Sequence, residues 1–246
     1  MTVSVIKGRI ADIERSSYSD GPGMRTVVFF KGCPLHCEWC HNPECISSEI
    51  ETMFYPEKCI GCKRCDEGCY SGARTVCGRD VTSEELMSEL LADRDYFGEK
   101  GGVTFSGGEP LMQREFLREM ISLCEKENVN TAVETSLFYF DEDIFSRLQT
   151  VMADLKAWDS DVHKRYTGVG NEIIIENFKR LDKLGVPIIM RTPVIPGVEQ
   201  GIENIEAFTA SLKNVVKYEK LPYHSLGVEK SRALGRTQKD FSEGNK

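Results

Sequence analysis

The stretch KGCPLHCEWCHNPE, residues 31–44, contains three cysteines, Cys33, Cys37 and Cys40, in a C-x3-C-x2-C pattern. A [4Fe–4S] cluster held by only three thiolates leaves one iron open for a small-molecule ligand. A closed zinc site usually needs four ligands, so the fourth would have to be a neighbour: His36, His41 or Cys45. The spacing therefore indicates a metal centre, either a structural zinc loop or a cluster with a catalytic role.

The apolar run TVVFFKG, residues 26–32, leads directly into this stretch and predicts a β-strand. Similar β-branched runs recur along the chain, most of them separated by segments with helical periodicity. The six predicted strands cover residues 26–32, 102–106, 131–135, 150–156, 186–194 and 218–224. This alternation predicts an α/β fold with functional residues at the carboxyl ends of parallel strands. Of an open doubly wound sheet and a barrel, we expect a partial (β/α)6 TIM-like barrel.

Three intervening segments carry specific helix signals. Residues 114–129 place apolar side chains on one face, and residues 171–185 end at a glycine, as helices often do. The segment 82–97 begins with a capping box formed by Thr82 and Glu85. We expect a helix in each segment.

The composition excludes several classes of protein. The 246 residues, 40% apolar and 28% charged, are typical of a globular protein with one main core. No stretch approaches the roughly 18 consecutive apolar residues of a membrane span, and the formal net charge of -8 argues against a nucleic-acid surface. The N-terminus lacks the apolar segment of a secretion signal, so we expect a cytoplasmic protein. The polar residues from about Thr237 predict a disordered tail.

A second group of cysteines has the spacing of a bacterial ferredoxin. Ten cysteines in a chain expected to stay in the cytoplasm favour metal binding over disulfides. The stretch KCIGCKRCDEGCYSGA, residues 58–73, has the pattern C-x2-C-x2-C-x3-C. It predicts one auxiliary [4Fe–4S] cluster bound by Cys59, Cys62 and Cys65, with either Cys69 or Cys77 as the fourth ligand.

The segment that carries this second group, residues 55–80, is too short to bury a core of its own. An iron–sulfur cluster would serve as its staple. We therefore expect one barrel domain over residues 1–246 with a small iron–sulfur insert of the ferredoxin type at residues 55–80.

Several further motifs surround these cysteines. They are SDGPGMR (19–25), CHNPE (40–44), SGGEP (106–110), ETS (134–136), DLK (154–156), HKRYTGVGNEIIIENFKRL (163–181), IMRTPVIPG (189–197) and LPYHSLG (221–227). Together with the three-cysteine loop they resemble the radical S-adenosylmethionine (SAM) superfamily. Within it, they resemble the glycyl radical enzyme activating enzymes of the pyruvate formate-lyase activator type. The resemblance extends from about residue 8 to about residue 235, and the number of independent motifs argues against chance.

The resemblance implies a radical enzyme that acts on a protein. In this family the open iron binds the amino and carboxylate groups of SAM, and an electron from the cluster cleaves the S–C bond. The resulting 5'-deoxyadenosyl radical removes hydrogen from a glycine of a partner glycyl radical enzyme. A flavodoxin or ferredoxin would donate the electron. A radical SAM enzyme with a small-molecule substrate is the alternative, whereas an electron carrier or a zinc-stapled binding module leaves SGGEP and DLK without a role.

The resemblance also implies cofactor contacts. Trp39 would pack on the adenine ring. The backbone at Gly107 and Gly108 would approach the methionine end of SAM, and Glu109 would accept a charge-assisted hydrogen bond from its ammonium group. Four residues at later strand ends would also reach the cofactor, the first three as candidate catalytic groups: Asp154, Lys156, Arg191 and His224.

Two further expectations come from the same family. A monovalent cation would lie beside the cofactor, held by carboxylate and carbonyl oxygens of Glu134, Thr135, Met152 and Asp154, with a glutamate here in place of an aspartate. The SDGPGMR loop, through Arg25, would help to receive the glycine-bearing loop of the partner. The simpler alternative for this loop is a turn that starts the first strand.

Overall fold

The computed structural model describes residues 6–242. Within them the main sheet has the strand order β10-β9-β8-β7-β6-β2-β1-β5. The first six of these strands are parallel and match the six predicted runs: β2 (Arg25–Phe30), β6 (Gly102–Gly107), β7 (Asn130–Thr135), β8 (Thr150–Asp154), β9 (Ile188–Val194) and β10 (Val215–Pro222). The sheet ends at β10 on one side and at β5 on the other without closing. The prediction of a partial (β/α)6 barrel is confirmed.

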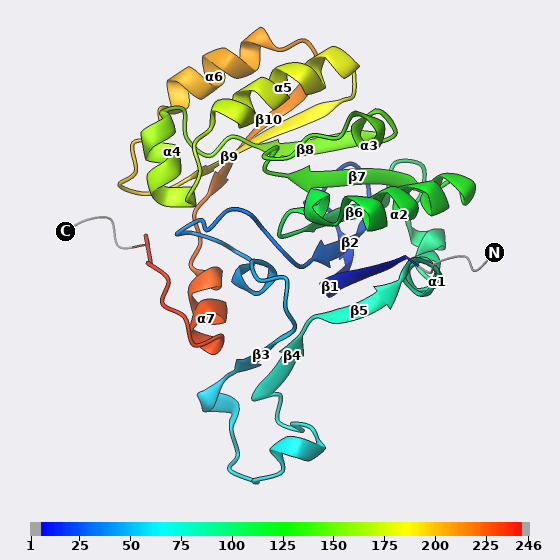
Figure 1. Cartoon of the computed structure of the whole chain (residues 1–246), viewed down its shortest axis with the longest axis vertical. Coiled ribbons are helices and arrows are strands. Elements are labelled where there is room, and N and C mark those ends of the chain that lie inside the picture. Colours follow the sequence, from blue (N-terminus) through cyan, green and yellow to red (C-terminus); the bar gives the residue numbers. More distant parts are fainter. Residues whose placement is uncertain (1–5, 243–246) are drawn as a thin grey trace.

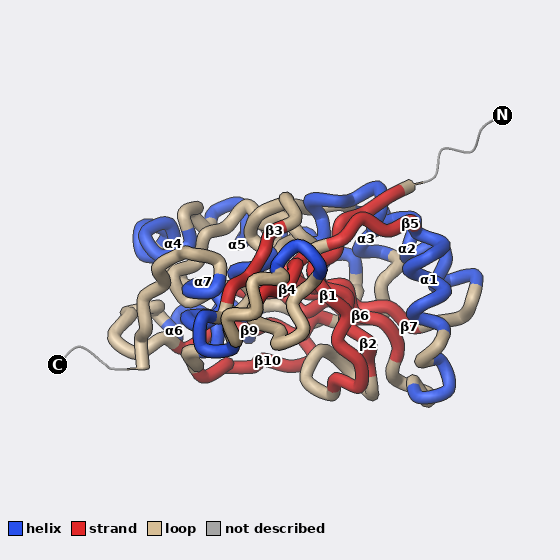
Figure 2. The backbone as a smooth tube through the Cα atoms, turned by 90° about the horizontal axis from the view of Figure 1, so that it is seen from below, coloured by secondary structure: helices blue, strands red, loops and turns tan. Residues whose placement is uncertain are grey.

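Helices connect successive parallel strands, and Figure 2 shows α1, α2, α3 and α5 along one side of the sheet. The helices are α1 (Ser83–Leu91), α2 (Arg114–Lys126), α3 (Glu142–Ser146), α4 (Ser160–Thr167), α5 (Glu172–Leu184), α6 (Ile202–Ser211) and α7 (Leu226–Ala233). The three helices expected from sequence correspond to α1, α2 and α5. The capping box at the start of α1 is present, because the Thr82 side chain accepts from the Glu85 backbone and Glu85 accepts in return.

Two further strands of the main sheet flank the cysteine region in the sequence. β1 (Lys7–Ser17) pairs antiparallel with β2, and β5 (Arg79–Thr82) pairs antiparallel with β1. Neither strand was expected from the sequence. Both extend the sheet beyond the six parallel strands, so the first parallel strand, β2, is paired along both of its edges.

A separate hairpin carries the second cysteine group. It consists of β3 (Glu51–Phe54) and β4 (Arg74–Cys77), which pair antiparallel and apart from the main sheet. Figure 1 shows this hairpin projecting away from the barrel, with α7 near its base. Five short 3-10 turns complete the described elements: η1 (Pro43–Cys45), η2 (Pro56–Lys58), η3 (Cys65–Glu67), η4 (Arg94–Tyr96) and η5 (Pro110–Gln113).

The main core lies between the sheet and its helices, where Phe105 and Phe178 are fully buried. The segment from Thr237 was expected to be disordered, but the structure shows residues 237–242 following α7, with Phe241 only 3% exposed against Trp39. That expectation was wrong for these residues because one aromatic side chain anchors an otherwise polar segment; the rest of the tail lies outside the described residues. In the part of the chain described, no helix has the length and apolar character needed to span a membrane.

Candidate active site

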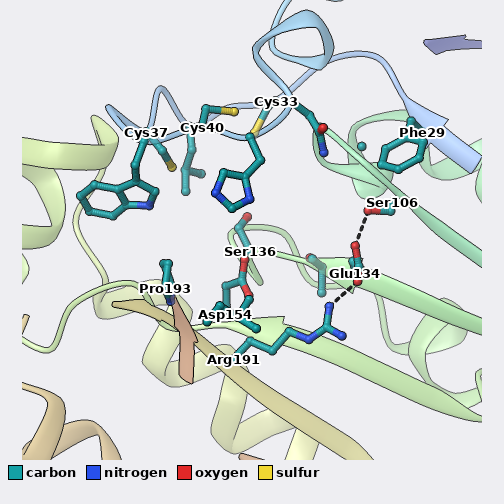
Figure 3. A pocket seen from close by; sticks show the side chains of 18 of the residues that line it. Phe29, Cys33, Cys37, Cys40, Ser106, Glu134, Ser136, Asp154, Arg191 and Pro193 are labelled. Carbon is teal, nitrogen blue, oxygen red and sulfur yellow. Dashed lines mark hydrogen bonds and ion pairs between the residues drawn. The ribbon is translucent and has the colours of Figure 1, made fainter. Parts of the chain in front are cut away.

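The first cysteine loop follows directly after β2 and lines a cavity of about 460 Å³. Figure 3 shows Cys33, Cys37 and Cys40 on one side of this cavity, opposite the strand ends. Burial raises the pKa of all three thiols, that of Cys40 to about 12. Because iron binds thiolates, cluster binding here would release protons from these groups.

The donor set fits a cluster better than a single ion. Among residues 6–65 and 67–242, no three His, Cys, Asp or Glu side chains form a group that could hold one metal ion, so the structure gives no support to a zinc loop. The irons of a [4Fe–4S] cluster occupy separate corners, so its thiolate ligands stand further apart than the ligands of one ion. Three thiols beside an open cavity therefore fit a cluster with one iron free for a further ligand.

The alternation of side chains along the strands brings charged residues to the opposite wall. In β7, β8 and β9 one set of alternate residues packs beneath the helices, and the other set faces the cavity. The register places Glu134 beside Met152 and Asp154 beside Arg191 on neighbouring strands. Lys156, just beyond β8, lines the same cavity. The structure thus brings these candidate residues together.

Arg191 is the centre of a buried polar network. Its guanidinium pairs with Glu134, donates to Glu219 Oε2 at 2.8 Å and donates to the Ser19 carbonyl at 2.6 Å. Ser106 donates to the second oxygen of Glu134 (Figure 3). Burial raises the pKa of Glu134 to about 7, although Arg191 acts in the opposite direction. Near neutral pH the charge on this carboxyl group therefore depends on its pairing with Arg191.

Lys156 and Asp154 form a second ion pair at the cavity, with Nζ 2.7 Å from Oδ2. Burial lowers the pKa of Lys156, but the negative charge of Asp154, together with that of Cys37 in its thiolate form, more than offsets this effect, so the pKa is raised. Lys156 is therefore a cation at the cysteine side of the cavity, where an anionic group of a ligand would be stabilised.

Gly107 and Gly108 both line the cavity, but their close contacts are with the chain itself. A Cβ on Gly107 would overlap the backbone of Phe30, and Gly107 has φ +104°, which favours glycine. A Cβ on Gly108 would overlap the Gly32 carbonyl and lie 2.6 Å from the Cys45 carbonyl. These glycines therefore allow the end of β6 to pack tightly against the backbone that flanks the cysteine loop.

Glu109 does not reach the cavity in this structure. It is completely buried, and its carboxylate accepts from Thr135 Oγ1 at 2.9 Å, from Ser136 N at 2.9 Å and from Ser136 Oγ at 2.6 Å. This carboxylate is therefore bonded to the end of β7, and its contact with the cofactor ammonium stays a prediction. Thr135 lines the cavity as expected, although its hydroxyl is used by Glu109.

Trp39 and His224 both line the cavity, each with a neighbouring aromatic ring. Trp39 is 4% exposed and its ring lies 5.6 Å from that of Tyr166, so it has a packing role whatever it contacts in the cavity. The ring of His224 stacks on that of His41 at 3.6 Å. His41 follows the last cysteine of the loop, and the stack joins this loop to the end of β10.

Arg25 does not have the role expected from sequence. It is completely buried and donates from Nε to Thr104 Oγ1 at 2.6 Å, from Nη2 to the Val103 carbonyl at 2.7 Å and from Nη1 to Asn130 Oδ1 at 3.1 Å. Burial lowers its pKa to about 10. The expectation of a direct contact with a partner protein is wrong, because Arg25 lies at the start of β2 and ties this strand to β6 and β7.

The second cysteine group lies on the exposed end of the β3–β4 hairpin. Cys59, Cys62 and Cys65 are exposed, and Cys69 is half-buried with its Sγ 3.5 Å from Ser71 Oγ. Cys77 is buried within β4 against Met53 and Ala233. Of the two candidates for a fourth ligand, Cys69 therefore lies in the same loop as the first three, and Cys77 lies in the packed base.

Three residues of this site were not expected from sequence to lie in the cofactor cavity, although His41 was named as a possible zinc ligand. Ser106 and His41 line the cavity, and each lies within a quoted motif, SGGEP or CHNPE. Glu219 was not identifiable in this way, since its place depends on the pairing of β10 with β9, which sets it beside Arg191. Motif membership was a usable signal for the first two residues, whereas the third required the strand register.

The comparisons with known proteins agree with the fold and the cysteine loop described above. Residues 27–208 match the radical SAM superfamily. A solved structure of Streptococcus suis SuiB bound to precursor peptide SuiA is similar to 87% of this chain, covering 42% of that chain, with a TM-score of 0.59 and 16% identity. At this identity the likeness concerns the fold alone.

More similar relatives narrow the family. The 4-hydroxyphenylacetate decarboxylase activating enzyme of Clostridioides difficile is 34% identical over 98% of this chain and 89% of its own length. The pyruvate formate-lyase-activating enzyme of Clostridium pasteurianum is 36% identical over 94% of this chain and 88% of its own length. The (2S)-3-sulfopropanediol dehydratase activating enzyme of Klebsiella oxytoca is 34% identical over 93% and 86%. This chain belongs to the glycyl radical enzyme activating enzymes of the radical SAM superfamily.

Proposed function

We propose that this chain activates a partner glycyl radical enzyme, with its cavity as the site where SAM is held and cleaved. The observation that carries the proposal is the arrangement of three cysteine thiols across one cavity from paired charged residues at the carboxyl ends of parallel strands. When bound, a [4Fe–4S] cluster with SAM on its open iron supplies the electron that cleaves SAM to a 5'-deoxyadenosyl radical, which takes hydrogen from a glycine. The small-molecule alternative is not favoured, because the relatives named above are activating enzymes.

The residues of the chain then have distinct tasks. Cys33, Cys37 and Cys40 are the proposed cluster ligands. Lys156, a cation next to these cysteines, would bind the carboxylate of SAM by a charge-assisted hydrogen bond. Arg191 would stabilise the same end of the cofactor after exchanging one of its carboxylate partners.

The apolar part of the site would orient and shield the rest of the cofactor. Trp39 and His224 offer aromatic surfaces on which the adenine can stack. Gly107 and Gly108 leave backbone without side chains at the cavity wall, within reach of the methionine part of SAM. Such an arrangement keeps water from a reactive radical.

The direct test is the transfer of a radical to a partner. The reduced protein, mixed with SAM and a glycyl radical enzyme encoded beside it, should produce a doublet signal in electron paramagnetic resonance. The main splitting should disappear when the partner glycine carries deuterium at Cα. Rapid cleavage of SAM with a small metabolite, and no protein radical in any neighbouring glycyl radical enzyme, would favour the small-molecule function instead.

The hairpin is the proposed site of one auxiliary [4Fe–4S] cluster, so that residues 55–80 form a small ferredoxin-like insert within the barrel domain. Cys59, Cys62, Cys65 and Cys69 are the proposed ligands. The exposure of the first three supports this choice, as does the packed position of Cys77. A reduced flavodoxin or ferredoxin of the cytoplasm would supply the electron.

A monovalent cation beside the cofactor is a lesser proposal. Its candidate carboxylates, Glu134 and Asp154, are paired with Arg191 and Lys156, so a cation would bind once Arg191 has turned from Glu134 to the cofactor. SAM should then bind more tightly in potassium than in a buffer with only bulky organic cations. The difference should vanish in Glu134→Gln, and equal affinity in both buffers for the unsubstituted protein would remove the cation from the site.

A further inference from the structure

Residues 223–241, called here the C-terminal clamp, contact the cysteine loop, and two of them, His224 and Lys230, also line the cavity. This segment follows the last strand and contains α7. Figure 1 shows α7 near the cysteine region and the base of the hairpin, away from the helices that cover the sheet. Its contacts therefore do not serve to complete the barrel core.

Gln238 bonds directly to a candidate cluster ligand. Its Nε2 donates to the Cys40 carbonyl at 2.9 Å, and Ser231 Oγ donates to its Oε1 at 2.5 Å. The second bond fixes the orientation of the amide, so that the Nε2 group faces the loop. A Cβ on Gly227 would overlap the same Cys40 carbonyl, which shows how closely α7 packs against the last cysteine.

Lys230 fixes the residues that follow Cys40. Its Nζ donates to Asn42 Oδ1 at 3.0 Å and pairs with Glu44 Oε1 at 2.5 Å. The side chain of Glu44 is 13% exposed, so this ion pair is partly shielded from water. The turn after the cysteine loop is thereby tied to α7.

Two further cations, Arg236 and Lys31, extend this attachment to the hairpin. Arg236 donates to the Pro43 carbonyl at 2.9 Å and pairs with Glu51 at the start of β3. Lys31, whose side chain is completely buried, donates to the Glu44 carbonyl at 2.7 Å and pairs with Glu51 at 3.2 Å. One carboxylate, Glu51, therefore links the clamp, the end of β2 and the hairpin.

Phe241 covers the middle of the loop. Its ring lies 6.0 Å from that of Trp39, which stands between Cys37 and Cys40, and 5.7 Å from that of Tyr223. The other end of the loop is held from α4, since His36 N donates to the Thr167 carbonyl at 2.8 Å. The barrel side thus supports the first half of the loop, and the clamp supports the second half.

We propose that the C-terminal clamp holds the second half of the cysteine loop in its cluster-binding shape, with Gln238 and Lys230 as positioning residues that act through Cys40 and Glu44. A loop of this kind has few backbone bonds of its own, so its shape depends on bonds from its neighbours. Loss of the clamp contacts should loosen the loop and expose the cluster to chelation. The proposal rests on ligation of a cluster by Cys33, Cys37 and Cys40.

The test uses the full reconstituted chain under anaerobic conditions and a ferrous-iron chelator. The readout is the rate at which the reduced cluster signal that responds to SAM disappears in electron paramagnetic resonance. Gln238→Ala and Lys230→Met should lose this signal about five- to tenfold faster than the unsubstituted protein, the factor expected from one lost buried hydrogen bond. Lys230→Arg keeps the charge and should restore most of the protection. Arg232→Met, at an exposed position of α7, is the matched control.

The outcomes distinguish a failure of the clamp proposal from a failure of cluster ligation by Cys33, Cys37 and Cys40. An unsubstituted protein that never shows a SAM-responsive cluster signal would refute the ligation by these cysteines. Equal rates of loss for Gln238→Ala, Lys230→Met and the unsubstituted protein would refute the clamp alone. A loss as fast in Lys230→Arg or Arg232→Met as in Lys230→Met would also refute it. Circular dichroism at the start of each measurement shows that the variants compared are folded.

Discussion

Gly108→Ala should separate the packing role of the SGGEP motif from cofactor contact. The added Cβ would lie 2.6 Å from the Cys45 carbonyl, where ordinary contact begins at 3.4 Å, so this backbone would have to retreat by about 0.8 Å. Gly32, whose carbonyl oxygen would lie 2.2 Å from the added Cβ, would also have to move, and it cannot move freely. Gly32 N donates to the Cys45 carbonyl at 2.8 Å, and Glu109 N donates to the Gly32 carbonyl at 2.8 Å.

Forced displacement of packed backbone costs about 1–3 kcal/mol. For a chain of this size, each kcal/mol lowers the unfolding temperature by about 2–4 °C, so the expected decrease is about 2–12 °C. Because the displaced backbone leads into Cys33, misplacement by about 1 Å should also reduce SAM cleavage by about 100-fold. Both effects have one cause, so they should appear together.

The assay compares thermal unfolding, iron content and SAM cleavage by dithionite-reduced protein. Gly170→Ala is the matched control, because its Cβ would meet only the ends of the Glu172 and Ser160 side chains, which can turn away. It should change the unfolding free energy by less than about 0.5 kcal/mol. If Gly108→Ala unfolds at the temperature of the control and cleaves SAM at the unsubstituted rate, the packing argument is refuted.

Three other outcomes are expected. Cys62→Ser should reduce iron from about eight to about four atoms per chain and leave SAM cleavage by dithionite-reduced protein largely intact; an unchanged iron content contradicts the auxiliary cluster. Burial lowers the pKa of His163 from its usual 6.5, so the unfolded chain takes up the proton first and the free energy of unfolding should fall as pH drops below 6.5. His163→Gln should weaken that dependence, and an unchanged slope would assign it to other groups. Arg25→Met should lower the unfolding temperature by about 10 °C, because it leaves buried acceptors on β6 and β7 unpaired; a stable variant that fails only in partner activation would restore the docking role.

The barrel could be predicted from sequence because its strands are local features. Each parallel strand is a short β-branched run followed by a polar motif, and each predicted long helix has a complete apolar face. The candidate residues Asp154 and Arg191 were identifiable for the same reason, since strand ends in such folds meet at one edge. The metal centre could be predicted from the spacing of the three cysteines alone, without knowledge of the fold.

Side chains whose partners are distant in sequence were not predictable in this way. Arg25 stands in a glycine-rich motif that suggests an exposed loop, yet its acceptors are 78 and 105 residues away. Glu109 similarly bonds to Ser136, 27 residues later. Phe241 is a lone aromatic in a polar segment, and a single such residue gives no periodic signal. In each case the register of the folded sheet or loop, rather than the local sequence, decides burial.

The bond between Gln238 and Cys40 joins residues 198 positions apart. Since a chain is synthesised from its N-terminus, the cysteine loop leaves the ribosome long before the residues that press against it exist. Until synthesis has passed Phe241, the growing chain can present its thiols but cannot enclose them. Delivery of iron and sulfide to a nascent chain would therefore meet an open loop, and stable maturation of the enzyme should follow translation rather than accompany it.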